Sequence, residues 1–133
     1  MKKIAGLLLI LMLVMTLYGC QFSEHGDIYD DESRWTQSGD TYSFLGMVET
    51  NDHISFKRFS GIFTLKRWTV DGEWIITIDQ EIDQGQFKCF LVTEDDEVIE
   101  LFEGENIIPA HEGRYRLRIV ANDAKGSLSY TIG

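Results

Sequence analysis

Three arginines alternate along one stretch near the C-terminus and form the most specific charged feature of the sequence. Arg114, Arg116 and Arg118 are each separated by one apolar residue, so on a β-strand their side chains share one face at intervals of about 6.7 Å. Guanidinium groups bind carboxylates and phosphates through a planar fork of donors. The stripe predicts a patch for an anionic wall polymer or an acidic partner. The alternative is an outward strand face paired with acids of neighbouring strands, such as Glu97 or Glu100.

Tryptophan side chains offer a second kind of binding surface, because an exposed aromatic ring presents a flat face that can stack against a sugar. Trp74 falls in an apolar alternation and is expected in the core. Trp35 lies in a polar segment, where we expect it to be partly exposed, and Trp68 stands between Arg67 and Thr69. Trp35 and Trp68 are therefore the candidates for carbohydrate stacking.

A run of four acidic residues separates two apolar stretches and consists of Glu94, Asp95, Asp96 and Glu97. Because aspartate favours turns and the four charges solvate a hairpin tip, we interpret the run as a β-turn. The alternative is a calcium site completed by another loop, since calcium prefers several oxygen ligands. No other metal site and no cofactor are expected.

The sequence carries no recognisable catalytic set. The three histidines stand apart without zinc-ligand spacing; they are His25, His53 and His111. No G-x-S-x-G motif is present, and Cys89 alternates with apolar residues, as expected of a small buried hydrophobe. We expect a noncatalytic protein, and a small hydrolase remains an alternative.

The net charge argues against one class of partner. The chain has 12 basic and 22 acidic residues, for a formal net charge of -10. Such a surface repels phosphate backbones and anionic lipid headgroups. We therefore expect no nucleic-acid binding, and attachment to a membrane would have to come from a covalent anchor.

The N-terminus has the three parts of an export signal. Lys2 and Lys3 are followed by an uncharged apolar run, residues 4–18, and then by Gly19 and Cys20. As a helix this run spans about 22 Å, which is less than the roughly 30 Å of a hydrocarbon core. A cleaved signal helix is therefore favoured over a permanent membrane span.

The residues Leu17-Tyr18-Gly19-Cys20 resemble the lipobox of bacterial lipoproteins. The resemblance implies transfer of a diacylglyceryl group to the Cys20 sulfur and cleavage after Gly19. Two or more acyl chains hold a protein stably on a bilayer. We expect a protein anchored through Cys20 to the extracytoplasmic face of the cell membrane.

The segment that follows the cysteine is polar and acidic. Its charges repel one another, so residues 20–40 are expected to form the lipidated N-terminus and a flexible tether. From residue 41 onward the apolar period is two and turn residues recur, which predicts strands. The clearest strand expected is residues 114–121, and further strands are expected at residues 42–48, 54–59, 86–93 and 98–102.

Two glycine-containing pairs are expected to form turns. Asp71-Gly72 predicts a type I′ hairpin in which Thr69 faces Trp74. Lys125-Gly126 is expected to separate two further strands. Eight or nine short strands result, and no helical period appears after the signal. We predict one small antiparallel β-sandwich, jelly-roll-like, over residues 41–133.

The glycine and aromatic spacing of this region is similar to that of small β-sandwich modules in surface lipoproteins of Gram-positive bacteria. The residues concerned are Phe59-Ser60-Gly61, Gly113-Arg114-Tyr115 and Lys125-Gly126-Ser127. The sequence thus predicts a membrane-anchored lipoprotein with a noncatalytic binding module. Its partner is expected to be an envelope protein or a glycan, with a carbohydrate or an anionic wall polymer as the alternative ligand.

Overall fold

The computed structural model describes residues 25–109 and 113–133, so the expected signal segment and Cys20 lie outside the described residues. Two short helical turns precede the strands: η1 (Gly26–Asp30) and α2 (Glu32–Trp35). The strands are β1 (Thr41–Leu45), β2 (Val48–Glu49), β3 (His53–Val70), β4 (Trp74–Val92), β5 (Val98–Leu101), β6 (Gly104–Ile108) and β7 (Gly113–Ile132).

The described residues form a single seven-stranded antiparallel sheet, which confirms the predicted all-β class. Strand order along the sheet is β1-β3-β7-β4-β5, with β2 paired to β3 and β6 paired to β4. The 20-residue strand β7 is central and pairs with β3 on one side and with β4 on the other. Every other strand is attached to one of these three.

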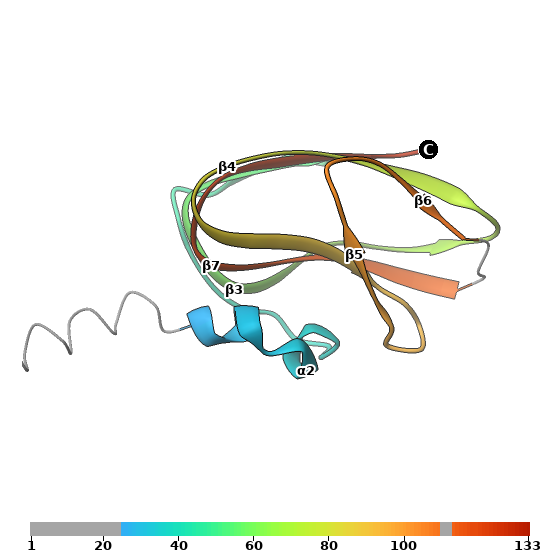
Figure 1. Cartoon of the computed structure of the whole chain (residues 1–133), viewed down its shortest axis with the longest axis horizontal. Helices are drawn as coiled ribbons and strands as arrows, with labels where there is room; N and C mark the ends of the chain where they lie inside the picture. Colours follow the sequence, from blue (N-terminus) through green and yellow to red (C-terminus); the bar gives the residue numbers. More distant parts are fainter. Residues whose placement is uncertain (1–24, 110–112) are drawn as a thin grey trace, which may run out of the picture.

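The sheet folds over on itself because its three longest strands bend together (Figure 1). Register shifts mark the bend, between Phe56 and Phe59 in β3 and around Gln84 in β4. In β7 the bend contains Asp123, whose φ is 53°. Such irregularities add twist and curvature to a strand. The two halves of β3, β4 and β7 therefore lie in two facing layers, which form the sandwich.

Gly85 shows why the bend requires particular residues. Its φ is +80°, and a Cβ at this position would lie 2.2 Å from the carbonyl oxygen of Asp123 on the neighbouring strand. Only glycine combines that backbone conformation with so close an approach. The bend of β4 against β7 thus depends on the absence of a side chain here.

An apolar core fills the space between the two layers. It takes alternate residues from the halves of the long strands, as the period of two predicts. Its members include Ile54, Phe59, Ile76, Leu117 and Leu128, all at or near zero exposure. Cys89 belongs to the same core, which agrees with its expected role as a small hydrophobe.

The predicted strands coincide with observed ones, except that residues 46–47 divide the strand expected over 42–48 into β1 and β2. Two predicted turns are wrong. Lys125-Gly126 lies inside β7, and the sequence breaks that suggested eight or nine short strands are bends within three long ones. Asp71-Gly72 joins β3 to β4, yet these strands do not pair, because β7 lies between them. Thr69 pairs with Arg114 rather than facing Trp74.

The predicted flexible tether is wrong for residues 25–40, which we call the N-terminal strap. The strap packs on the outer face of the sheet, where Ile28 and Trp35 are 1% and 2% exposed. The Trp35 ring stacks on Phe90 at 4.9 Å, and its indole nitrogen donates to the Ile28 carbonyl at 2.9 Å. Ile28 and Trp35 are enough to hold the strap on the sheet because both side chains are almost completely buried.

Candidate functional site

The arginine stripe occupies one face of β7, as its spacing predicts, but that face is not an open surface. Arg118 is completely buried, Arg116 is largely buried and Arg114 is exposed. The strap covers the two arginines nearest the middle of the strand. The expectation that all three form one exposed anion patch is therefore wrong, because the patch would need Arg118 at the surface.

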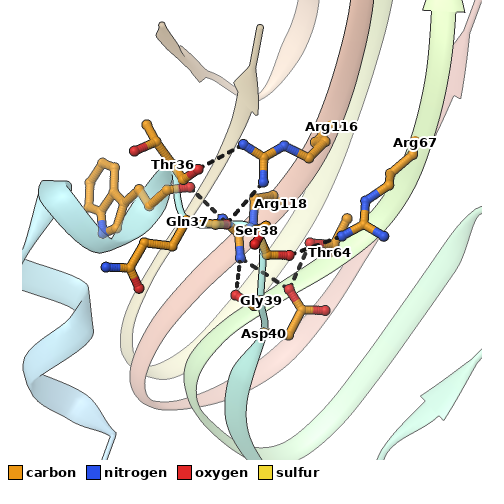
Figure 2. A network of polar contacts seen from close by, with 10 residues as sticks. Thr36, Gln37, Ser38, Gly39, Asp40, Thr64, Arg67, Arg116 and Arg118 are labelled. Carbon is orange, nitrogen blue, oxygen red and sulfur yellow. Dashed lines mark hydrogen bonds and ion pairs between the residues drawn. The ribbon is translucent and has the colours of Figure 1, made fainter. Parts of the chain in front are cut away.

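Arg118 binds the backbone of the strap instead of an external anion (Figure 2). Its Nη1 donates to the carbonyls of Trp35 and Gln37, both at 2.6 Å. Its Nη2 donates to the Gly39 carbonyl at 2.8 Å and to the Asp40 carboxylate at 3.1 Å. Burial lowers the pKa of Arg118, and the hydrogen bond that Arg118 donates to Asp40 opposes that effect. This guanidinium is a structural clamp.

Two further arginines hold the same stretch of backbone. Arg116 donates to the carbonyls of Thr36 and Gln37, both at 2.9 Å. Arg67 on β3, the cross-strand partner of Arg116, donates to the Ser38 carbonyl at 3.3 Å (Figure 2). The backbone carbonyls that follow the last turn of α2 have no partners within the helix, and they accept hydrogen bonds from these arginines.

A groove opens where the strap meets the end of the sandwich, and its volume is about 900 Å³. The strap forms one side, the last residues of β3 and the first of β7 form the floor, and the turn between β4 and β5 forms the other side. Its lining consists of Thr36, Ser38, Arg67, Trp68, Thr69, Val92, Thr93, Glu94, Asp96, Arg114, Tyr115 and Arg116.

Trp68 and Tyr115 border this groove, but their rings point to the inner core, on the face of the sheet opposite Arg67, Arg114 and Arg116. Trp68 is partly exposed and stacks on the buried Tyr115, with ring centroids 6.1 Å apart. Trp74, from the facing layer, packs edge-on against both rings. The groove face therefore consists of arginine and hydroxyl side chains, and the aromatic rings belong to the core behind it.

The charges that line the groove differ from those of the whole chain. Three arginines face two acids, Glu94 and Asp96, so the lining carries a net charge of +1 in a chain of net -10. Asp96 lies 3.5 Å from Arg116. Arg114 is exposed and makes no hydrogen bond or ion pair with residues 25–109 or 113–133. Its donors remain available for an anionic group.

The structure thus brings together some of the predicted binding residues and separates others. Arg114 and Arg116 line one groove, whereas Trp68 borders it with its ring turned to the inner core. Trp35 is part of the strap, is buried against the sheet and cannot stack against a sugar. Arg67 was missed, because only the register of β3 against β7 shows that it lies opposite Arg116.

The acidic run forms the turn between β4 and β5, as interpreted from the sequence. Thr93 holds it: its carbonyl accepts from the Asp96 amide at 3.0 Å, and its hydroxyl accepts from the Glu97 amide at 3.1 Å. Asp96 adopts a positive φ of 61°. In the described residues no three His, Cys, Asp or Glu side chains converge as metal ligands. The calcium alternative for Glu94, Asp95, Asp96 and Glu97 therefore lacks geometric support.

Two other groups with reactive potential are used structurally. The Cys89 thiol is buried, and burial raises its pKa far above the ordinary value, so this thiol does not supply a thiolate. His53 begins β3 and contacts the Ser129 hydroxyl through Nδ1 at 2.6 Å. It is part of the strand pairing, opposite Ser129.

Comparison with protein-family models, with curated proteins and with solved structures finds no match to this chain. Over residues 25–109 and 113–133, no helix has the length and apolar character needed to cross a bilayer.

Proposed function

We propose that this protein is a lipid-anchored envelope protein whose β-sandwich binds an anionic glycan or wall polymer in the groove lined by Arg67, Arg114 and Arg116. The observation that carries the proposal is the gathering of three arginines in one groove of a chain whose net charge is -10. Binding, without catalysis, is the activity that this lining supports.

The lining suits a polar ligand that carries negative charge. Thr36, Ser38 and Thr69 contribute hydroxyl-bearing residues to the groove. Arg114 and Arg67 offer guanidinium donors to phosphate or carboxylate groups. A volume of about 900 Å³ is within the range typical of ligand pockets. One or two units of a polymer would fill such a groove.

The proposed location rests on the N-terminal sequence. A positive N-terminus, an apolar run and Leu17-Tyr18-Gly19-Cys20 are typical of a bacterial lipoprotein signal. The net charge of -10 gives the chain no general attraction for anionic lipids. We therefore propose that acyl chains on Cys20 hold the protein at the extracytoplasmic face of the cell membrane.

Titration of the mature chain with a poly(glycerol phosphate) polymer tests the groove. A lipid-free Cys20→Ser version is used, and tryptophan fluorescence reports binding. We expect saturable binding that Arg114→Ser weakens by about tenfold or more, as loss of a charge-assisted contact worth about 1.5 to 3 kcal/mol implies.

Lys125→Ser is the matched control, because it removes an equal charge from an exposed position at the bend. A neutral polysaccharide tests whether charge is required. If Lys125→Ser weakens binding as much as Arg114→Ser does, attraction is nonspecific and the groove proposal is wrong. Loss of the anchor is tested separately by Cys20→Ala, which we expect to release the protein from the detergent phase.

A further inference from the structure

Three exposed apolar side chains gather at the bent end of the sandwich. Leu45 is 62% exposed, Val48 is 59% exposed and Met47 is 39% exposed. They lie where the chain passes from β1 in one layer to β2 in the other. Gly46, between them, lies so near Lys57 in the bend of β3 that a Cβ on Gly46 would come within 2.9 Å of the Lys57 side chain. The protein thus leaves an apolar edge uncovered at this end.

The same end is where the N-terminal strap begins. Gly26 lies against the Asn122 side chain, so closely that a Cβ on Gly26 would come within 2.3 Å of its oxygen. The next residue of β7, Asp123, forms an ion pair with Arg58, and Arg58 pairs with Leu45 across β1 and β3. Figure 1 shows the strap starting beside the curved strands.

The number of residues before the strap limits the distance to a lipid anchor. Five residue steps separate Cys20 from His25, and an extended chain spans at most about 3.6 Å per residue. A lipid on Cys20 therefore cannot lie more than about 18 Å from the start of the strap. The docked strap leaves no long tether that would hold the domain away from the bilayer.

The distribution of charged side chains favours one orientation of the domain relative to the membrane. The bent end carries three basic residues, Lys57, Arg58 and Lys125, and four acids, Glu49, Glu81, Asp83 and Asp123, so its charges nearly balance. The outer side of the strap instead exposes a run of acids, which are Asp27, Asp30, Asp31 and Glu32. An anionic bilayer repels the strap surface more strongly than the bend. We therefore expect the bent end of the domain, and not the outer surface of the strap, to face the membrane.

We propose that the bent end, with Leu45, Met47 and Val48 at its edge, is the surface that rests on the lipid bilayer. This inference rests on the proposed anchor at Cys20. It places the groove on the far side of the molecule, because Arg67 lies nine residues from Arg58 along β3, about 30 Å at 3.3 Å per residue. The groove then faces away from the membrane, toward the polymers of the envelope.

Depth-dependent quenching tests the orientation on the full lipidated protein. An environment-sensitive fluorophore is attached to Leu45→Cys or, as a second position, Val48→Cys. Asp71→Cys, exposed in the β3–β4 connection at the open end, is the matched control. Cys89 is buried and does not compete for the label. The proteins are reconstituted in phosphatidylethanolamine–phosphatidylglycerol vesicles with and without lipids brominated on the acyl chains.

We expect a blue shift and quenching by the brominated lipids at positions 45 and 48, and neither effect at position 71. Equal quenching at both ends, or none at positions 45 and 48, overturns the orientation. Mass spectrometry of Cys20 and vesicle flotation report the anchor independently. An acylated, floating protein without quenching refutes this inference alone, whereas an unmodified Cys20 refutes the anchor and the orientation with it.

Discussion

Two apolar clusters stabilise this protein, and they differ in what covers them. The inner core lies between two layers of the same sheet, so each layer covers the other. The outer cluster consists of Ile62, Phe90, Val92 and Val120 on the sheet, and its cover consists of Ile28 and Trp35 from the strap. The inner core is built into the alternation of the strands. The outer one depends on a segment whose composition resembles that of a linker.

The difference shows how a mostly polar segment can be part of a fold. The strap contributes few apolar atoms, but arginines on β3 and β7 bind its carbonyls and replace the hydrogen bonds that water would supply. The strap is therefore held in two ways, by packing of its apolar side chains on the sheet and by hydrogen bonds from arginines to its backbone carbonyls. The strap also forms one side of the groove through Thr36 and Ser38, so its docking and the proposed binding site are connected.

The largest effect is expected in the inner core. Phe59 has no exposed surface and stacks on Phe44 with centroids 4.3 Å apart. Phe59→Ala should lower the free energy of unfolding by about 4 kcal/mol. Urea denaturation followed by circular dichroism measures it. A loss below about 1 kcal/mol would mean that the two layers do not pack as described.

Trp35→Ala tests the outer cluster. The ring is buried against Phe90, so we expect a loss of about 3 kcal/mol together with faster proteolysis of the strap. Trp35→Phe keeps most of the ring and should lose much less. If Trp35→Ala had the same free energy of unfolding as the parent protein, the strap would not contribute to stability, and the comparison between the two clusters would fail.

Replacing the buried clamp should have a smaller effect. Arg118→Met removes the donors to the carbonyls of Trp35, Gln37 and Gly39 but keeps an apolar stem in place. We expect a loss of about 2 kcal/mol, since several acceptors are left without partners. Arg114→Met, at the exposed end of the same strand face, is the control and should stay within about 0.5 kcal/mol of the parent.

The smallest effect is an acid-side pH dependence at the bend. Hydrogen bonding to Arg58 lowers the pKa of Asp123. The folded state therefore gains stability from this carboxylate above its unfolded-state pKa, and the gain is lost as the pH falls through the lower folded value. Both side chains are well exposed, so the gain is small. Asp123→Asn should flatten the pH profile of stability on the acid side, and an unchanged slope would contradict the pairing.

Much of the sheet could be predicted from the sequence, because alternation identifies a strand locally. Tyr115, Leu117 and Ile119 face the core as expected. The length of the strands was not predicted, because a glycine-containing bend inside one strand has the same composition as a glycine-containing turn between two strands. Cys89, Phe90, Leu91 and Val92 are buried in succession, a run typical of a strand covered on both faces. That run indicates that both faces of the strand are covered, but it does not show which segment of the chain covers the outer face.

The groove was predicted only in parts. Arg114 and Arg116 were identified by residue type, whereas the position of Arg67 opposite Arg116 depends on a register shift between Thr64 and Lys66 in β3. Single-residue shifts of this kind move side chains to the other face of a strand. Nothing local in the sequence fixes such a shift. The binding residues could therefore be named before the fold was known, but not assembled into one site.

Hydrogen exchange of the lipid-free mature protein tests most directly whether the strap belongs to the fold. The amides of Ile28, Asp31 and Arg34 donate to backbone carbonyls within the strap, and the Trp35 indole proton is bound to the Ile28 carbonyl in a buried contact. We predict that these protons exchange far more slowly than in a free peptide. Exchange at the rate of an unstructured peptide would contradict the docked strap, and with it the wall that the strap gives to the groove.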